Sequence, residues 1–148
     1  MARSGSPHIT IVLAADHAGH PLKETIRSYL ELEGHEVVDV KPELEPADDY
    51  PAIMADGAKR VLKQKAIGIF FGGSGNGEAM AANKVRGIRA ALCYNEETAT
   101  LARSHNDANV LSLGARLTKP DLALKIVDLF LETPFEGGRH VARIKDLE

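Results

Sequence analysis

The sequence IGIFFGGSGNGEAMAANKV, residues 67–85, decides the fold. An apolar run over residues 67–71 ends in a glycine-rich turn, and the turn passes directly into an alanine-rich segment. Short apolar runs bounded by turn residues are typical of buried strands, and alanine favours helices. The stretch therefore predicts a strand, a loop and a helix in immediate succession, with the chemistry of the protein at the loop.

The loop has the composition of an anion-binding site. Glycines at 72, 73, 75 and 77 let a ligand approach the backbone without meeting Cβ atoms. Because the loop opens a helix, its free N–H groups and the helix dipole direct partial positive charge at whatever lies above it. Glu78 lies at the rim, where a carboxylate suits a general base beside a stabilised oxyanion. Acidic residues are also common in first helical turns, so a solvated cap is the simpler interpretation of Glu78 alone.

Three known loop motifs do not match this stretch. A Walker A loop ends in Gly-Lys-Ser/Thr, and the dinucleotide pattern ends in glycine, whereas both alignments place Glu78 at the decisive position. A nucleophile elbow, G-x-S-x-G, fits Gly72 and Ser74 but has Asn76 in place of its last glycine. The usual nucleotide cradle is thus excluded and nicotinamide binding is disfavoured. A serine hydrolase at Ser74 stays a weak alternative.

Composition indicates a single α/β-sized domain. The chain has 148 residues, 44% of them hydrophobic, and we expect a flexible leader over residues 1–8 and one domain over 9–148. A net charge of −3 without a long basic run argues against a nucleic-acid partner. No apolar run is long enough to cross a membrane, and the first seven residues lack the core of a secretory signal. A cytoplasmic protein is expected, with the lone Cys93 buried and unreactive.

Strand-like and helical patterns alternate five times along the chain. The predicted strands are residues 9–15, 37–40, 67–71, 88–94 and 110–113. Helical spacing of apolar residues follows each strand, with Pro21, Pro51 and Pro120 near helix starts and Asn95 as an N-cap. This alternation predicts a doubly wound, Rossmann-like α/β fold, a three-layer sandwich with a five-stranded parallel sheet and helices on both faces.

Polar residues follow three of the predicted strands. Asp16 and His17 come after the first strand, the glycine loop after the third, and Arg116 after the fifth. Ligands of doubly wound folds bind beyond the carboxyl ends of the strands, at the switch point of the sheet. One rim of the sheet is therefore expected to gather these residues into one site.

Five motifs carry a resemblance to a known family. They are AADHAGHPLKE (14–24), DDYP (48–51), GGSGNGEAMAANKVRGIRAAL (72–92), SHNDANVLSLGAR (104–116) and FEGGRH (135–140). Together they resemble the ribose-5-phosphate isomerase type B family, which includes the galactose-6-phosphate isomerase subunits, over about Ile9 to Arg143. The resemblance implies aldose–ketose isomerisation of a sugar phosphate without metal or other cofactor. It also implies a homodimer, sometimes a tetramer, with active sites at the subunit interface.

The loop differs from that of many family members. Those members carry a catalytic cysteine at the position of Gly72, whereas this chain is similar to the branch with GGSGNGE, in which the glutamate is the base. That branch implies Glu78 as the base, in agreement with the interpretation of the loop itself. A second difference is VKPELEP at residues 40–46, where members usually have a glycine just after the strand.

The resemblance implies roles for further residues. His105 would open the sugar ring, and Asn106 and Asp16 would bind hydroxyl groups, although an isolated histidine is more often a structural hydrogen-bonding residue. Ser74 would orient a hydroxyl group or the oxyanion. The remaining substrate contacts would come from His17, Arg116, Arg139 and Arg143 at the phosphate and from Gly73, Gly75, Asn76 and Gly77 in the loop.

The favoured reaction interconverts D-ribose 5-phosphate and D-ribulose 5-phosphate through a cis-enediolate. Allose or galactose 6-phosphate and erythrose 4-phosphate remain alternative substrates, because they require only a longer or shorter reach between the loop and the arginines. Two other classes stay open. One is a serine hydrolase that uses Ser74 with His105, and the other is a non-catalytic phosphosugar-binding module.

Overall fold

The computed structural model describes residues 8–148, so most of the expected leader lies outside the described residues. The strands are β1 (Thr10–Ala15), β2 (Glu36–Asp39), β3 (Ile67–Gly72), β4 (Ala90–Leu92) and β5 (Val110–Gly114). The helices are α1 (His20–Leu32), α2 (Tyr50–Gln64), α3 (Asn76–Asn83), α4 (Glu96–Ser104), α5 (Pro120–Glu132) and α6 (His140–Leu147). The predicted alternation of strands and helices is confirmed.

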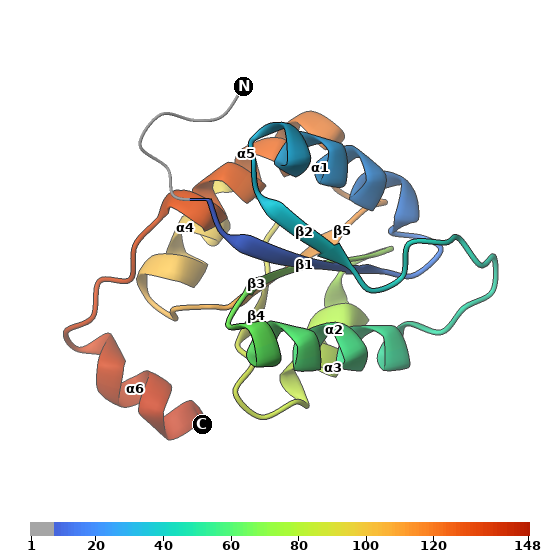
Figure 1. Ribbon diagram of the computed structural model, residues 1–148. Coiled ribbons are helices and arrows are strands. Elements are labelled where there is room, and N and C mark those ends of the chain that lie inside the picture. The colour runs from blue at the N-terminus through green and yellow to red at the C-terminus, as the bar shows by residue number, and fades with distance from the viewer. Residues whose placement is uncertain (1–7) are drawn as a thin grey trace.

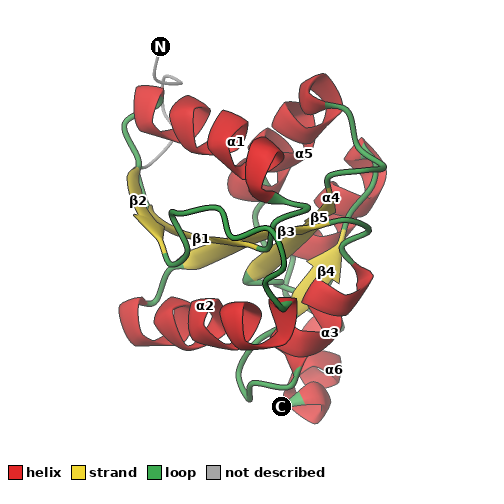
Figure 2. Cartoon of the chain, turned by 90° about the vertical axis from the view of Figure 1, so that its right-hand side faces the viewer, coloured by secondary structure: helices red, strands yellow, loops and turns green. Residues whose placement is uncertain are grey.

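The five strands form one parallel sheet in the order β2-β1-β3-β5-β4. Helices α1, α4 and α5 cover one face, and α2 and α3 cover the other (Figures 1 and 2). The predicted doubly wound sandwich is therefore confirmed. β1 and β3 are neighbours in the sheet, and the connections that follow them lead to opposite edges of the sheet. The loops after these two strands therefore diverge and form the switch point.

The core lies in two layers because successive side chains of a strand point to opposite faces. Ile11 and Leu13 of β1 pack under α1 and α5, whereas Val12 and Ala14, which alternate with them along the strand, pack against α2. Phe70 and its neighbour on β3, Phe71, divide between the two faces in the same way, and both are fully buried. Continuous apolar runs in the sequence thus correspond to strands covered on both faces.

Local signals fix where the helices begin and end. Gly34 follows α1 with φ +89°, and Asn95 caps α4 through a capping box with Thr98, in which its side chain accepts from the Thr98 amide at 2.8 Å. Pro51 and Pro120 lie in the first turns of α2 and α5. These residues carry the sequence-based predictions of the helices, and each prediction is confirmed.

β1, β3 and β5 differ from their predicted limits by one residue at one end, whereas β4 and β2 differ at both ends. β4 spans only three of the seven residues expected, because the amide of Arg89 is taken by the Asn109 side chain at 2.8 Å and the amide of Tyr94 by the Thr98 hydroxyl at 3.1 Å. The amides near both ends of the apolar run are thus satisfied by side chains, although the Arg89 carbonyl oxygen still accepts from the Val110 amide at 3.3 Å. β2 lies one residue earlier than predicted.

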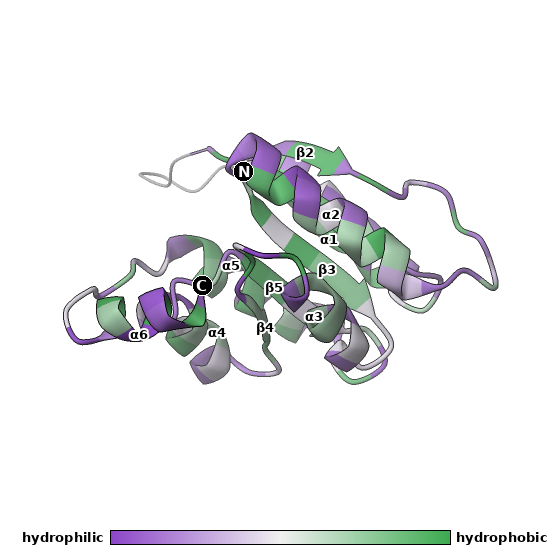
Figure 3. Ribbon diagram, turned by 90° about the horizontal axis from the view of Figure 1, so that it is seen from below, coloured by the Kyte–Doolittle hydropathy of each residue, from purple (hydrophilic) through white to green (hydrophobic). Residues whose placement is uncertain are grey.

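The two ends of the sheet carry different segments. The hydrophilic loop that joins β2 to α2 extends beyond the carboxyl ends of the strands, whereas α6 lies at the opposite end of the molecule (Figures 1 and 3). Within residues 8–148, no helix is long and apolar enough to cross a membrane.

Candidate active site

The glycine loop forms a tight link between β3 and α3. Gly75 precedes α3 with φ +84°, a conformation that favours glycine, and a Cβ added to it would lie 2.6 Å from Leu92. A Cβ on Gly114, at the end of β5, would lie 2.4 Å from the carbonyl oxygen of Ser74. The loop therefore packs backbone against backbone on the neighbouring strand end, and its position is set by the sheet.

Glu78 lies in the first turn of α3 and is only 4% exposed. Its carboxyl group turns back towards the end of β3, so that a Cβ added to Gly72 would lie 1.9 Å from the Glu78 Cδ atom. Burial raises the pKa of Glu78, and the charge of Asp16 raises it further, against hydrogen bonds from the backbone of Glu78 and Gly75. A solvated helix cap is thus the wrong interpretation of this residue.

The loop amides are partly engaged within the protein. The amide of Asn76 donates to the Ser74 hydroxyl at 3.2 Å, and the backbone of Gly75 and Glu78 favours the charged form of the Glu78 carboxyl group. The expectation that the loop amides are free for an incoming anion therefore needs correction at Asn76. The effect of its hydrogen bond is to orient Ser74 within the loop.

Asp16 and His17 follow β1 and reach the same end of the sheet. Asp16 is 7% exposed and accepts from the Gly19 amide at 3.0 Å, which shapes the turn into α1. Asp48 accepts from both the backbone amide of His17 at 2.9 Å and its Nδ1 atom at 3.0 Å. The hydrogen bond to Asp48 raises the pKa of His17. Asp48 thereby holds the imidazole in one orientation and favours its charged form.

Arg116 completes this group at the end of β5. Its backbone amide donates to the carbonyl oxygen of Gly73 at 3.0 Å, and its exposed guanidinium reaches over Gly73, with Nη1 3.0 Å from the place of an added Cβ. The charge of Arg116 acts on His17, whose pKa it lowers slightly against the effect of Asp48. The expected gathering at one rim is found for Asp16, His17, Glu78 and Arg116.

The loop over residues 40–49 is anchored at both ends. Lys23, a fully buried residue of α1, donates to the carbonyl oxygen of Lys41 at 2.8 Å and pairs with Asp39 at 2.7 Å. At the other end, Asp48 holds His17, and the Tyr50 ring covers Gly77, where an added Cβ would lie 2.5 Å from the ring hydroxyl. The roles of Lys23, Asp48 and Tyr50 were not predicted, because their partners lie far away in the sequence.

His105 and Asn106 lie at the opposite end of the sheet. They precede β5, and in the same turn the carbonyl oxygen of Asn109 accepts from the amide of Gly68, near the start of β3, at 2.9 Å. Since all strands are parallel, this end carries the amino termini of the strands, whereas Glu78 follows their carboxyl ends. The described chain thus does not bring His105 and Glu78 together.

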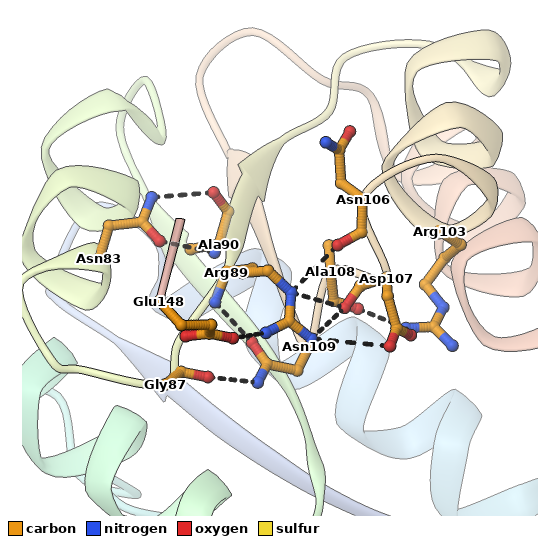
Figure 4. A network of polar contacts seen from close by, with 10 residues as sticks. All are labelled: Asn83, Gly87, Arg89, Ala90, Arg103, Asn106, Asp107, Ala108, Asn109 and Glu148. Atoms are coloured by element: carbon orange, nitrogen blue, oxygen red, sulfur yellow. Dashed lines mark hydrogen bonds and ion pairs between the residues drawn. The ribbon is translucent and has the colours of Figure 1, made fainter. Parts of the chain in front are cut away.

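Arg89 holds the turn that carries Asn106 (Figure 4). Its Nε atom donates to the Asn106 carbonyl oxygen at 3.0 Å and Nη2 to that of Asp107 at 2.8 Å, and Nη1 pairs with the Glu148 carboxylate. The Asn106 side-chain amide points away from this network in Figure 4. Arg89 lies within a quoted motif, but neither pattern nor spacing assigned it a role.

The predicted arginines of the C-terminal segment lie with His105. Arg139 and Arg143 are exposed residues at the start and middle of α6, and between them His140 is buried and stacks on His105 with 4.3 Å between ring centroids. Burial lowers the pKa of His140, aided by the charges of Arg139 and His105. The predicted site residues therefore form two groups, one at each end of the sheet.

The fold and the first group define a class of protein. It is a doubly wound α/β protein with a glycine loop, a histidine, an arginine and two buried carboxyl groups at the switch point. The family model described as Ribose/Galactose Isomerase matches residues 11–147, and the chain belongs to that family. The resemblance found in the five motifs is confirmed at this level.

Relatives and solved structures agree with the family. The chain is 46% identical over 136 residues to a probable ribose-5-phosphate isomerase B of Mycoplasma pneumoniae, covering 90% of each chain. It is 44% identical over 137 residues to ribose-5-phosphate isomerase B of Mycobacterium tuberculosis, covering 90% of this chain and 85% of the other.

Among solved structures, a ribose 5-phosphate isomerase of Thermotoga maritima superposes with a TM-score of 0.92 at 46% identity, over 95% of this chain and 98% of that one. The enzyme of Mycoplasma genitalium with bound ribulose-5-phosphate gives 0.90 at 44% identity, over 93% of each chain.

Proposed function

We propose that the protein is a ribose-5-phosphate isomerase that interconverts D-ribose 5-phosphate and D-ribulose 5-phosphate. Relatives that are 44–46% identical to this chain are ribose-5-phosphate isomerases or probable ones, and the related structure from Mycoplasma genitalium holds ribulose-5-phosphate. The observation that carries the proposal for this chain is the buried Glu78 carboxylate at the glycine loop. It supplies the proton acceptor that an aldose–ketose isomerisation requires.

Glu78 acts as the general base. Its carboxylate removes the proton from C2 of the open-chain aldose, which leaves a cis-enediolate, and returns the proton to C1 to give the ketose. A raised pKa suits this task, because it brings the base closer to the pH at which the protein works. The carboxylate is buried at the end of β3, so it needs little reorganisation before it accepts the proton.

The packing around Gly72 supports Glu78 rather than residue 72 as the base. The cysteine that many family members carry would stand at position 72, where an added Cβ lies 1.9 Å from the Glu78 Cδ atom. A side chain at 72 and the carboxylate of Glu78 therefore compete for one place. The glutamate base of the GGSGNGE branch thus occupies the space of the cysteine base.

Negative charge on the carbonyl oxygen is stabilised at the start of α3. The dipole of α3 acts at this position, and the Ser74 hydroxyl, whose oxygen accepts from the Asn76 amide, can donate its proton to the oxygen. Loss of one such donor typically costs about 3 kcal/mol of barrier. Asp16, beside the loop, holds a sugar hydroxyl.

Phosphate and ring opening involve both groups of residues. His17 and Arg116 provide cations at the Glu78 end of the sheet, and Arg139 and Arg143 provide cations at the His105 end. His105 opens the ring and Asn106 binds a hydroxyl group. The five residues of β5 alone span about 13 Å from first to last at 3.3 Å per residue, which exceeds the length of a pentose phosphate. One chain therefore supplies only half of these contacts to one substrate.

A homodimer with shared active sites resolves this separation. In a two-fold dimer the His105 group of one subunit faces the Glu78 group of the other, and the same pairing is repeated by symmetry. Light scattering on the purified protein is expected to give twice the chain mass of 16.0 kDa or a multiple of it. A catalytically active monomer would contradict the shared site.

The decisive test is Glu78→Gln, which keeps the shape and removes the base. We expect kcat to fall by roughly 10²–10⁴-fold, the usual contribution of a general base, while the affinity for ribose 5-phosphate survives. Glu33→Gln is the matched control, because Glu33 is also a buried glutamate, 7% exposed, but lies at the end of α1. Retained turnover in Glu78→Gln would exclude Glu78 as the base.

The substrate is tested by comparing kcat/KM for four-, five- and six-carbon sugar phosphates under the same conditions. A clear preference for allose 6-phosphate, galactose 6-phosphate or erythrose 4-phosphate would refute the five-carbon assignment. Within one chain His105 lies at the opposite end of the sheet from Ser74, so a serine hydrolase that uses both residues would also need the shared site of a dimer. Stoichiometric labelling of Ser74 by a fluorophosphonate would support that alternative.

A further inference from the structure

Three side chains near the C-terminus form a cluster whose potential ligand atoms face one another. They are His105, Glu136 and His140, and one ligand atom from each lies within 4.8 Å of the other two. The Nε2 atom of His105 is 3.8 Å from the Oε2 atom of Glu136, and the Nε2 atom of His140 is 3.6 Å from Oε1. The carboxylate thus faces two imidazoles with a different oxygen for each.

The backbone brings the three residues together before any ligand binds. His105 ends α4, and the amide of Glu136 donates to the carbonyl oxygen of Ser104 at 3.0 Å, which fixes Glu136 beside it. Gly137 and Gly138 then turn the chain with φ of +72° and +56°, and His140 begins α6 directly afterwards. Residues other than glycine rarely adopt a positive φ, least of all at two successive positions. The two glycines of the sequence therefore specify this turn.

The spacing is longer than ordinary hydrogen bonds require. A charged N–H group and a carboxylate approach to about 2.8 Å, whereas Glu136, which is half exposed, stands 3.6 and 3.8 Å from the two rings. Ligands around a tetrahedral Zn²⁺ ion lie roughly 3.4 Å apart, since each is about 2.1 Å from the metal. The separations of 3.6 and 3.8 Å, each to a different oxygen of the carboxylate, are near that spacing, and one ligand atom from each of the three residues lies within 4.8 Å of the other two.

His140 gives a second and independent indication. The residue is 6% exposed, and its Nε2 atom is buried without a hydrogen-bond partner among the described residues. A buried polar atom without a partner is costly unless something satisfies it. This atom points into the cluster, where an ion would satisfy it, while the more exposed His105 and Glu136 leave a route from solvent.

We propose that His105, Glu136 and His140 bind a divalent transition-metal ion of the Zn²⁺ class. Two imidazoles and one carboxylate with an open fourth position form a common donor set for zinc. The ion is not a cofactor of the isomerisation, which uses Glu78 at the other end of the sheet. Its consequence, which rests on the proposed function, is reversible inhibition, because the bound ion holds the imidazole of His105, the residue that would open the sugar ring.

The site is tested by direct metal binding to the full chain prepared without a histidine tag. Co²⁺ serves as a spectroscopic probe through the visible absorption of its tetrahedral complexes, and Zn²⁺ is titrated by calorimetry. We expect one site per chain in the wild type, with affinity reduced roughly 100-fold in Glu136→Gln and in His140→Asn, since even partners of ligands contribute 10–100-fold. Glu136→Gln is decisive if the buried His140 substitution disturbs folding.

The matched control is His35→Asn, because His35 also contacts a second histidine, His8, with 5.7 Å between ring centroids. This variant is expected to bind both metals as the wild type does. Equal affinity in the wild type and Glu136→Gln, or loss of binding in His35→Asn, would overturn the site.

Inhibition is measured separately from binding. Zn²⁺ is expected to inhibit isomerisation in the wild type, with recovery on adding a chelator, and to inhibit Glu136→Gln only at much higher concentration. Metal binding that depends on Glu136 supports the site even without inhibition, in which case the proposed role of His105 fails instead.

Discussion

Adding one methyl group at position 72 tests the proposed base without changing it. In Gly72→Ala the new Cβ would lie 1.9 Å from the Glu78 Cδ atom and 2.2 Å from each carboxylate oxygen, where ordinary van der Waals contact begins at 3.4 Å. Glu78 is therefore the group that must yield, and its carboxyl carbon must move by about 1.5 Å, the difference between these two distances.

A displacement of this size is large for a catalytic group. A misplacement of about 1 Å can cost roughly 10²-fold in rate, so we expect kcat of Gly72→Ala to fall at least about 10²-fold. The protein as a whole should lose only about 1–3 kcal/mol of stability, the usual cost of overpacking. The fall in kcat should thus be much larger than the loss of stability alone would cause.

The assay follows ketose formation from ribose 5-phosphate, with thermal unfolding of each variant in parallel. Gly68→Ala is the matched control, because its added Cβ would lie 2.9 Å from the side chains of Phe70 and Val61 at the other end of β3. Gly68→Ala should lose about as much stability as Gly72→Ala but should keep nearly the wild-type kcat. If Gly72→Ala keeps wild-type kcat, Glu78 is not the base in this position.

The same geometry predicts a replacement of the base. Gly72→Cys alone should be inactive, because the new side chain and the carboxylate of Glu78 compete for one space. Gly72→Cys combined with Glu78→Ala removes the competitor and should regain measurable activity through the thiolate. The regained activity should rise with pH as the thiol ionises and should be lost on alkylation; a double variant no more active than Gly72→Cys would contradict this reasoning.

Further predictions concern the shared site and the titrating residues. A mixture of Glu78→Gln and His105→Asn subunits, each inactive alone, should regain about a quarter of wild-type activity after exchange, since half of the dimers are mixed and each has one intact site; no recovery would contradict a shared site. For Glu78, burial raises the pKa, so kcat/KM should increase with pH through a value above that of an ordinary glutamate. Asp48→Asn should lower the pKa of His17, measured by NMR, and raise KM, because Asp48 supports the charged imidazole. The stability that wild type gains over Asp48→Asn should be present below the ordinary histidine pKa and disappear as pH rises through the raised pKa of His17.

Much of the fold is predictable because its signals are local. Two-sided burial gives the continuous apolar runs of β1 and β3, and Asn95, Gly34 and the prolines mark helix ends within a few residues. The limits of β4 are not local: they depend on Asn109, a residue twenty positions away from Arg89, whose side chain takes an amide that an isolated strand would leave for the sheet.

The candidate site is predictable only in part. Residues that follow strands meet at one rim by topology, which places Asp16, Glu78 and Arg116 together. Asp48 reaches His17 across 31 residues through a loop with no regular pattern, so spacing gives no sign of it. The position of His105 follows from its place before β5 rather than after it, and motif order alone does not reveal that this puts it at the other end of the sheet.

The single space shared by position 72 and Glu78 also limits how such loops can diverge. A lineage that exchanges the cysteine form for the glutamate form one residue at a time must pass through a chain with neither base, or through a chain in which both side chains collide. If Glu78 is the base as proposed, each intermediate is impaired although both end points are active. The two forms are therefore expected to be separate branches with few mixed sequences between them, and a survey of natural loops with both cysteine and glutamate would measure how strict that barrier is.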